Sequence, residues 1–384
     1  MKMQLYAPCH FGLEKTLAFE IRRAGGENLE VTDGRIIFSG SADVLVRTNI
    51  NCSVAERIGV VLARFRAENF DDVFAHVKSI PVGEFFPRDA NFPVVKGQSV
   101  SSKLTSIPAL QRTVKKALAE ALSLHYKLKP LPETGAVFPV RFFLHKDEMV
   151  VFLDSSGEGL HKRGYREKSG AAPIKETLAA GIIDIAKVRP DDIIIDPFCG
   201  SGTMLIEAAF KALRIPPCLN RRFAAEQWGF IPEKLWKEQR EALRAGIINA
   251  DFEAFGYDSD SECVKLTLEN AEKAGVEKYI RAQKRAIRDF CFPASPCKII
   301  TNPPYAERML EKPDVEQIYR EWQAAADGFS AKTNTQMFII TSDAEFETHF
   351  GRKADKNRKL YNGMLMCRLY IYTGTNMQEA RQGF

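Results

Sequence analysis

The chain of 384 residues lacks several patterns that mark well-known classes of protein. No apolar run approaches the roughly 18 residues that a membrane-spanning helix needs, and the first ten residues lack the apolar core of a signal peptide. The eight cysteines include no Cys-x-x-Cys pair, which argues against a zinc site and against a disulfide framework. We therefore expect reduced thiols, no bound metal, no membrane association and a cytoplasmic location.

A Gly-x-Gly-x-x-Gly sequence is also absent, which disfavours a dinucleotide-dependent dehydrogenase. The formal net charge is only +5, so the chain is not a uniformly basic protein. Residues 1–165 hold 22 Lys and Arg against 18 Asp and Glu, whereas residues 166–384 hold 32 against 31. The small excess in the N-terminal part fits contact with nucleic acid, although solubility alone explains it equally well.

What is present centres on residues 193–203. Three consecutive isoleucines predict a strand that is buried on both faces. Gly200 and Gly202 follow, and glycine lets a backbone turn sharply and approach a ligand closely. Residues 203–213 have the composition of a helix packed on a sheet, whose first N–H groups would point toward the loop. The stretch indicates a ligand-binding turn, although a tight turn without a ligand fits the same residues.

A second short apolar strand, residues 298–301, ends in Asn302-Pro303-Pro304-Tyr305. The two prolines fix φ and remove two N–H donors, so the chain should leave the sheet as a rigid elbow. Asn302 Oδ1 and the Pro303 carbonyl can accept the two N–H bonds of an exocyclic amine, and Tyr305 can stack on its ring. Ligands of open α/β sheets bind at the carboxyl ends of strands, where the strand order reverses. We expect both loops at that edge.

These two motifs in this order resemble the class I S-adenosylmethionine-dependent methyltransferases that modify exocyclic amines of nucleic-acid bases. The resemblance implies an α/β fold with a Rossmann-like, mostly parallel sheet of seven strands. It implies S-adenosylmethionine as the cofactor. A last antiparallel strand is expected at residues 365–372, after a strand at 337–341 and a basic turn at 352–359.

Two further loops carry acidic residues. Asp258 ends a predicted strand at residues 254–258 and can accept both ribose hydroxyls of a nucleoside. It lies farther than the usual ~20 residues beyond the glycines, because an insertion-like stretch at residues 214–250 intervenes. Asp260 is the alternative candidate. Asp289 can bond the adenine amine, with Phe290 or a neighbour against the ring.

The N-terminal part predicts two α+β units. In the first, strands at residues 3–6, 29–31, 35–38 and 58–65 alternate with helices near 13–24 and 42–50. In the second, helices at 71–79 and 109–125 accompany strands at 92–95, 136–144 and 149–154. The arrangement of the second unit is similar to a THUMP domain, which is an RNA-binding module.

Residues 155–172 read as a connector with four glycines and five basic residues. Basic side chains around an aromatic ring can hold a phosphate backbone, and a solvated linker is the alternative. The candidate RNA contacts are Lys162, Arg163, Tyr165 and Arg166. Pro173 is expected to open a helix at residues 174–187, whose N-terminus would lie near the cofactor pocket.

With the connector included, nearly the whole chain resembles the N-terminal half of the RlmL family, the bacterial 23S rRNA guanine-N2 methyltransferases. Long family members carry a second methyltransferase half, and the resemblance here is to the stand-alone form, which is expected to lack it. The resemblance implies a ferredoxin-like unit at residues 1–65, a THUMP RNA-binding domain at 66–155, a connector at 156–172 and a methyltransferase domain at 173–384.

The resemblance also implies roles for individual residues. The cofactor loop falls on Asp196, Phe198, Cys199, Gly200, Ser201, Gly202 and Thr203. The ribose acid falls on Asp258, the adenine contact on Asp289, and the residues at the methionine end on Arg166, Pro173, Lys175 and Thr177. The catalytic tetrad falls on Asn302, Pro303, Pro304 and Tyr305, with Asn302 also near the cofactor. Ala306 stands where the long form has glycine.

The leading hypothesis is an enzyme that makes N2-methylguanosine, with 23S rRNA or the assembling large ribosomal subunit as its partner. Three alternatives remain. They are a tRNA guanine-N2 methyltransferase, an adenine-N6 methyltransferase acting on RNA or DNA, and a non-catalytic RNA-binding assembly factor on the same scaffold. The oligomeric state is not indicated by the sequence.

Overall fold

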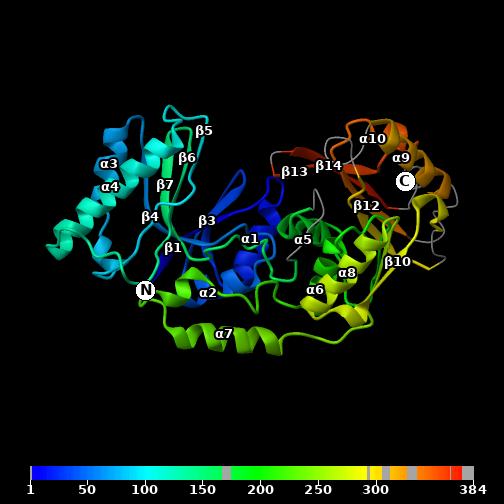
Figure 1. Cartoon of the computed structure of the whole chain (residues 1–384), viewed down its shortest axis with the longest axis horizontal. Coiled ribbons are helices and arrows are strands. Elements are labelled where there is room, and N and C mark those ends of the chain that lie inside the picture. Colours follow the sequence, from blue (N-terminus) through cyan, green and yellow to red (C-terminus); the bar gives the residue numbers. More distant parts are fainter. Residues whose placement is uncertain are drawn as a thin grey trace, which may run out of the picture. The chain divides into compact units, whose positions relative to one another are not determined.

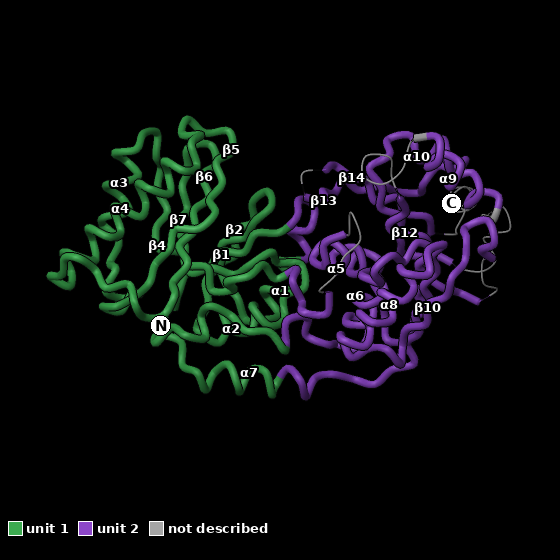
Figure 2. Tube along the Cα trace, in the orientation of Figure 1, with its two compact units in different colours: residues 1–9, 17–160, 220–242 green, residues 10–16, 161–219, 243–384 purple. Residues whose placement is uncertain are grey.

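A computed structural model describes residues 2–166, 174–291, 295–304, 312–326, 335–363 and 365–373. The chain divides into two compact units (Figure 2). Unit 1 comprises residues 1–9, 17–160 and 220–242, and unit 2 comprises residues 10–16, 161–219 and 243–384. Each unit therefore includes a short segment from the other's part of the sequence. The insertion-like stretch is divided, because its residues 220–242 pack with unit 1.

Unit 1 is built on one seven-stranded sheet in the order β2-β3-β1-β4-β7-β6-β5. All neighbours are antiparallel except β5 and β6. The strands are β1 (Met3–Pro8), β2 (Glu27–Thr32), β3 (Arg35–Gly40), β4 (Gly59–Arg66), β5 (Gln98–Val100), β6 (Val140–His145) and β7 (Glu148–Asp154). The helices are most of α1 (Glu14–Arg23), α2 (Ala42–Asn51), α3 (Phe70–Lys78), η1 (Val82–Glu84), α4 (Ile107–Tyr126), η2 (Ala224–Gln227) and most of α7 (Glu233–Ala245) (Figure 1).

Strand β4 joins the two predicted N-terminal units into this single sheet. On one side it pairs with β1 through Leu5 and Val60. On its other side it pairs with β7 along its length, from Gly59 to Arg66. The predicted boundary at residue 65 therefore falls within a strand that serves both units.

Two predicted elements of the chain are wrong. Residues 92–95 are not a strand and contribute only a single bridge between Val94 and Val140, because Pro93 cannot donate to a ladder. The strand forms later, at β5. The basic residues 352–359 are only partly a turn, since β13 begins at Lys356 and pairs with β14. Its first four side chains are exposed, and charged residues on an edge strand discourage pairing with other chains.

Unit 2 contains the second seven-stranded sheet, in the order β10-β9-β8-β11-β12-β14-β13. The strands are β8 (Ile193–Asp196), β9 (Glu253–Asp258), β10 (Ile280–Lys284), β11 (Lys298–Thr301), β12 (Gln336–Thr341), β13 (Lys356–Asn362) and β14 (Leu365–Tyr372). The helices are α5 (Glu176–Ile185), α6 (Thr203–Leu213), α8 (Ser261–Ala274), η3 (Glu277–Tyr279), η4 (Ile287–Asp289), α9 (Lys312–Ala326) and α10 (Phe346–His349). Only β14 runs against the others, as expected for the mixed sheet of class I methyltransferases.

The strand order reverses between β8 and β11. From β8 the chain proceeds to β9 and β10 on one side, and it returns to β11 and β12 on the other. An aromatic core beneath this edge fixes the later strands. Phe346 and Phe350 stack with their ring centres 5.2 Å apart, and Trp322 contacts Phe198 of the glycine loop edge-on, also at 5.2 Å.

Among the described residues, no helix is long and apolar enough to cross a membrane. All eight cysteines lie among the described residues, and no two of them are joined by a disulfide.

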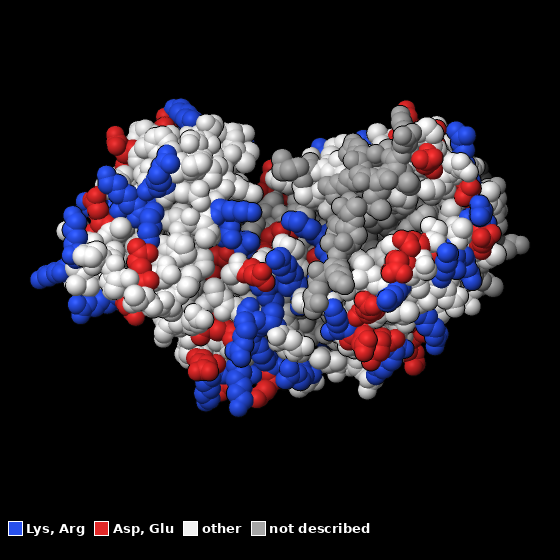
Figure 3. Space-filling model, viewed as in Figure 1, with Lys and Arg blue, Asp and Glu red and all other residues white. Residues whose placement is uncertain are grey.

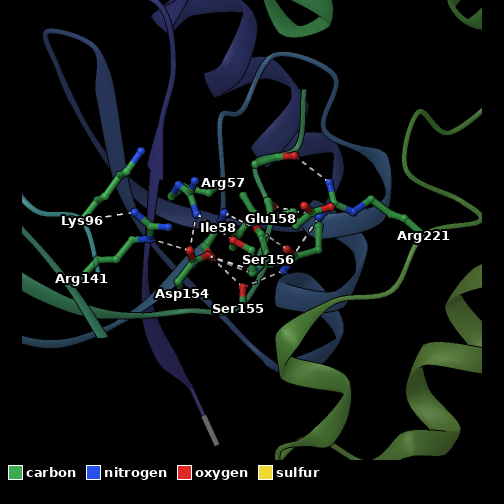
Figure 4. Close-up of polar contacts among 12 residues, drawn as sticks. Arg57, Ile58, Lys96, Arg141, Asp154, Ser155, Ser156, Glu158 and Arg221 are labelled. Carbon is green, nitrogen blue, oxygen red and sulfur yellow. Dashed lines mark hydrogen bonds and ion pairs between the residues drawn. The ribbon is translucent and has the colours of Figure 1, made fainter. Parts of the chain in front are cut away.

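A buried carboxylate, Asp154, lies at the end of β7 in unit 1 (Figure 4). Arg57 forms an ion pair with Asp154 Oδ2, and Arg141 Nε donates to the same oxygen at 2.6 Å. The Asp154 side chain is fully buried, whereas both arginines are partly exposed. Nearby, Arg221 donates to the carbonyls of Glu158 and Gly159, both at 2.8 Å, and so attaches residues 220–242 to the end of unit 1's sheet.

We expect Asp154→Asn to destabilise unit 1 by about 2–3 kcal/mol, because it removes the charge that two arginines share. Hydrogen exchange of the β4 and β7 amides measures this loss. The matched control is Glu30→Gln, which breaks the exposed pair between Glu30 and Arg64 and should cost less than about 1 kcal/mol. Equal effects of the two substitutions would show that the buried pair is not important.

Candidate active site

Three neighbouring strands of unit 2 bring the predicted site residues to one edge of the sheet. Asp196 is the last residue of β8, Asp258 ends β9 and Thr301 ends β11. Strand β8 pairs in parallel with both β9 and β11. The carboxyl ends of these strands therefore meet at the point of reversal, where open α/β sheets bind ligands. The two motifs are neighbours, as the sequence predicted.

Asp196 is the central group of this edge. It is 2% exposed. Its Oδ1 accepts hydrogen bonds from Thr301 Oγ1 at 2.5 Å and from the Phe198 N–H at 3.1 Å. Burial raises the pKa of Asp196 to about 7, although both hydrogen bonds favour the ionised form. The bond to Thr301 joins the glycine loop directly to the strand that carries the Asn-Pro-Pro elbow.

The glycine loop is held by its neighbours on both sides. The Gly200 N–H donates to Asp258 Oδ2 at 3.0 Å. From α8, Thr267 Oγ1 donates to the Gly200 carbonyl and Asn270 Nδ2 to the Ser201 carbonyl, both at 2.9 Å. The loop is therefore preorganised by side chains that lie about 70 residues later in the sequence.

The two glycines have different surroundings. Both adopt left-handed backbone conformations, with φ of 52° at Gly200 and 78° at Gly202. A Cβ atom on Gly202 would lie 2.9 Å from Thr267 Cγ2, whereas a Cβ on Gly200 would meet no atom within 4 Å. Gly202 is thus required for packing against α8. Gly200 borders open space, as expected of a backbone that a ligand approaches, and so fits a bound cofactor.

Asp258 and its competitor Asp260 have distinct environments. Asp258 is half-buried, its Oδ1 accepts from the Asp260 N–H at 3.0 Å, and burial raises its pKa. Asp260 is the N-cap of α8, and its Oδ1 accepts from the Glu262 N–H at 2.9 Å. The cap explains Asp260, so Asp258 remains the candidate for the ribose.

Asp289 lies on the short 3₁₀ helix η4, after β10. Its side chain is 67% exposed. Phe290 is buried and packs edge-on against Tyr257, with ring centres 5.8 Å apart. Phe290 is therefore a core residue rather than a free stacking surface, while the adenine contact of Asp289 stays a prediction.

The elbow begins with Asn302, which is half-buried, and Pro303, which is buried. Tyr319 Oη on α9 donates to the Pro304 carbonyl at 3.0 Å and lies 3.1 Å from Thr341 Oγ1. Tyr319 is fully buried, so it fixes where the elbow leaves the sheet. Tyr305, the predicted stacking residue, lies outside the described residues.

The connector differs from the expectation. Arg163 and Tyr165 are buried, at 7% and 3% exposed. Arg163 pairs with Glu207 of α6, and Tyr165 Oη donates to Glu207 Oε1 at 3.1 Å. This burial contradicts the predicted RNA contact for both residues, because Arg163 neutralises an internal carboxylate and Tyr165 donates a hydrogen bond to it. Lys162 is exposed and remains a candidate contact.

Arg166 is also engaged internally. Its Nη1 donates to Thr203 Oγ1 and to the Ile174 carbonyl, both at 3.0 Å, and its Nη2 pairs with Glu176. A role beside the cofactor loop therefore suits Arg166 better than a role on RNA.

The other predicted residues of the methionine end lie around the start of α5. Lys175 is the N-cap residue of the helix. Thr177 is buried, with its Oγ1 3.3 Å from His10 Nε2. Pro173 falls outside the described residues.

Several residues that organise the site were not predicted. They are Glu207, Thr267, Asn270, Thr301 and Tyr319. Their contacts are made across distances of about 15 to 105 residues in the sequence, so no local pattern marks them. The one sequence signal is polarity at an otherwise apolar position, as at Glu207 within α6.

The fold and this edge define a class I, S-adenosylmethionine-dependent methyltransferase. Three family models match the chain: an RlmL ferredoxin-like domain at residues 4–59, a THUMP domain at 67–154 and an RMKL-like methyltransferase domain at 163–371. The last covers more than half of the chain. The chain belongs to the RMKL-like methyltransferase family.

Curated relatives support this assignment. A putative RNA methyltransferase, YpsC, of Bacillus subtilis is 41% identical over 97% of this chain and 96% of its own length. A ribosomal RNA large subunit methyltransferase K/L of Methylococcus capsulatus is 30% identical over 97% of this chain. The chain spans about half of that protein, 51% of its length.

Solved structures agree. A possible methylase from Clostridium difficile 630 superposes with a TM-score of 0.92 at 40% identity, over 98% of this chain and 99% of its own. A putative methyltransferase complexed with SAH (S-adenosylhomocysteine) gives a TM-score of 0.89 at 36% identity, over 98% and 99% of the two chains. The cofactor is accordingly S-adenosylmethionine.

We expect Asp196→Asn to change how stability depends on pH. A carboxyl whose pKa is raised in the folded state stabilises the protein at low pH and loses that contribution as pH rises through the folded pKa. The free energy of unfolding of the variant, relative to that of wild type, should therefore rise by about 2 kcal/mol from roughly pH 5 to pH 8. Urea unfolding of both ligand-free proteins at the two pH values measures the difference. Parallel pH profiles would refute it.

We expect Gly200→Ala and Gly202→Ala to separate binding from stability. Each substitution should lower the free energy of unfolding by about 1–2 kcal/mol, because alanine disfavours the left-handed backbone. In Gly202→Ala the new methyl group also clashes with Thr267, so this variant should be the less stable of the two. Gly200→Ala should weaken S-adenosylhomocysteine binding by at least about tenfold. The control is Gly275→Ala, which has φ of 71° and open space at the end of α8. Calorimetry measures the binding and thermal unfolding measures the stability. Equal affinity of all three variants for S-adenosylhomocysteine would contradict the prediction.

Proposed function

We propose that this protein transfers a methyl group from S-adenosylmethionine to the exocyclic N2 of a guanine in RNA, with 23S rRNA as the substrate. The observation that carries the proposal is the Asn302-Pro303-Pro304 elbow at the end of β11, bonded through Thr301 to the Asp196 loop. An amine acceptor site and a cofactor loop thus belong to adjacent strands. The relatives named as ribosomal RNA large subunit methyltransferases support the choice of rRNA.

When bound, S-adenosylmethionine supplies a methyl group on a positively charged sulfur. The chain's part is to position the amine. An aromatic amine is a poor nucleophile, since its lone pair is delocalised into the ring. Hydrogen bonds from its N–H groups to Asn302 Oδ1 and the Pro303 carbonyl favour a more tetrahedral nitrogen, whose lone pair can then point at the methyl group. Such alignment supplies much of the rate in enzymes.

The hydrogen bonding of the elbow is compatible with this role. Tyr319 occupies the Pro304 carbonyl, whereas the Pro303 carbonyl accepts no hydrogen bond from any described residue. The carbonyls of Pro303 and Pro304 therefore differ in their hydrogen bonding. The first is available to a substrate amine, and the second anchors the elbow to α9. No general base is needed before methyl transfer, because the proton is lost afterwards.

Unit 1 supplies the features that favour RNA. Its THUMP domain matches residues 67–154. In Figure 3, Lys and Arg side chains gather over α4, with Asp and Glu among them. A pocket of about 600 Å³ beside this helix is lined by Arg112, Lys115 and Lys116 together with Pro93 and Pro108. Basic side chains bordering a pocket can bind the phosphates of RNA without reading its sequence. A cytoplasmic location is part of the same proposal.

The test is incubation with radiolabelled S-adenosylmethionine and total RNA from cells that lack the gene, followed by digestion to nucleosides. We expect label in N2-methylguanosine from the 23S band. The control is Asn302→Ala, which should keep cofactor affinity within about threefold and lose turnover by at least about 100-fold.

Other outcomes of this experiment are equally informative. Label in the tRNA band would keep the chemistry and change the substrate, and label in N6-methyladenosine would overturn the assignment of the amine. Retained turnover in Asn302→Ala would refute the mechanism. No label in total RNA would extend the same assay to assembling large ribosomal subunits and then to DNA. A protein that binds the cofactor and labels none of the three would be a non-catalytic RNA-binding factor.

A further inference from the structure

Strands β13 and β14 carry exposed basic and apolar side chains that the reaction itself does not use. Residues 352–368 hold six Lys and Arg against one Asp, although residues 166–384 as a whole hold 32 against 31. The first four side chains of β13 are exposed. No carboxylate among the described residues pairs with Lys356, Arg358 or Lys359. Positive charge is therefore concentrated on the outermost strand of the sheet in unit 2 (Figure 1).

Side chains on one face of this strand pair form a small platform. Lys359 lies opposite Arg368, and Tyr361 lies opposite Met366. Opposed residues share a face of the sheet with those two positions along. Tyr361 is half-buried, and the other three are exposed. Phe11, which belongs to unit 2, packs edge-on against Tyr361 with ring centres 5.7 Å apart and is itself 52% exposed. We call these five residues the β13 platform.

The register of the strands places the β13 platform at the edge that carries the active site. Arg368 pairs with Thr341, the last residue of β12, and β12 is the neighbour of β11, which leads into the elbow. Tyr361 and Met366 lie two positions farther in the same direction. Strand β13 is three strands from β11, or about 14 Å at the usual strand spacing. The platform is thus within a few nucleotides of a base held at the elbow.

The combination of side chains suits single-stranded RNA. Lys359 Nζ lies 5.4 Å from the centre of the Tyr361 ring, so a cation borders an aromatic surface. Unpaired strands bind where aromatic rings stack on bases and cations follow the phosphates. An RNA whose target base is swung out of its stack offers such a strand beside the elbow. Protein–protein interfaces, by contrast, are depleted of lysine.

We propose that the β13 platform binds the single-stranded RNA that flanks the methylated nucleotide. The two aromatic rings stack on a base, and the two cations contact phosphates. The platform then favours targets in unpaired stretches over targets in a rigid duplex. This inference rests on the proposed function only in that the substrate is RNA, and it does not depend on which amine receives the methyl group.

The experiment is fluorescence anisotropy of the full-length protein with a labelled oligouridine of about ten nucleotides, measured over a series of salt concentrations. Tyr361→Ala should weaken binding by roughly 5- to 100-fold without changing the salt dependence. Lys359→Ala removes one phosphate contact, so the slope of log K against log salt concentration should fall in magnitude by about 0.7. Tyr361→Phe keeps the ring and should restore the affinity. Unchanged affinity for S-adenosylhomocysteine shows that each variant is folded.

The matched controls are Lys278→Ala and Tyr279→Ala. Lys278 Nζ lies 4.7 Å from the Tyr279 ring centre, on η3 before the start of β10 and so at the opposite edge of the sheet. Both controls should keep the affinity and the salt slope of wild type.

Several results would overturn the proposal. They are wild type that does not bind the oligonucleotide, unchanged affinity in both Tyr361→Ala and Phe11→Ala, and equal losses in the controls. A dimer of wild type that Tyr361→Ala dissociates, with RNA affinity unchanged, would instead assign the platform to contact between two copies. Oligouridine contains no guanine, so a failure to find N2-methylguanosine would leave this result standing.

Discussion

The hydrogen bond between Thr301 and Asp196 is the contact on which the site depends. It joins the ends of two adjacent parallel strands, one leading into the glycine loop and the other into the Asn-Pro-Pro elbow. A buried aspartate is costly unless hydrogen bonds compensate it, so this bond both stabilises the carboxylate and fixes the spacing of the loops. Asp258 extends the same arrangement to β9 by accepting the Gly200 N–H. Cofactor loop and acceptor loop are therefore positioned by one short chain of polar contacts.

The sequence predicted those parts of the fold that depend on local pattern. Residues 261–274 followed by glycine gave α8 with its left-handed C-cap at Gly275, and residues 365–372 gave β14. Prediction was wrong where proline interrupted an apolar run at residues 92–95. It was incomplete at β13, which was predicted as a basic turn and forms a strand by pairing with β14. Edge strands of basic residues resemble turns until their neighbour in the sheet is known.

The connector shows the limit of reading charge from sequence. Arg163 and Tyr165 occur in a glycine-rich, basic stretch that has the composition of a surface, yet both are buried against Glu207. Glu207 itself lies in an apolar helix, and nothing local marks the two as partners. A buried ion pair adds little net stability but strongly disfavours arrangements that leave either charge alone. The same reasoning applies to Arg166, whose partners are Thr203 and Glu176.

The exchange of short segments between the two units has a consequence for how the chain can be divided. Residues 10–16 belong to unit 2, and residues 220–242 belong to unit 1. Leu13 fills the space beside Gly181 of α5, and Trp228 Nε1 donates to the Val137 carbonyl at 3.0 Å. Neither unit is a continuous length of polypeptide. No single cut in the backbone yields either one whole, and during synthesis unit 1 cannot be completed until the cofactor loop has already been made.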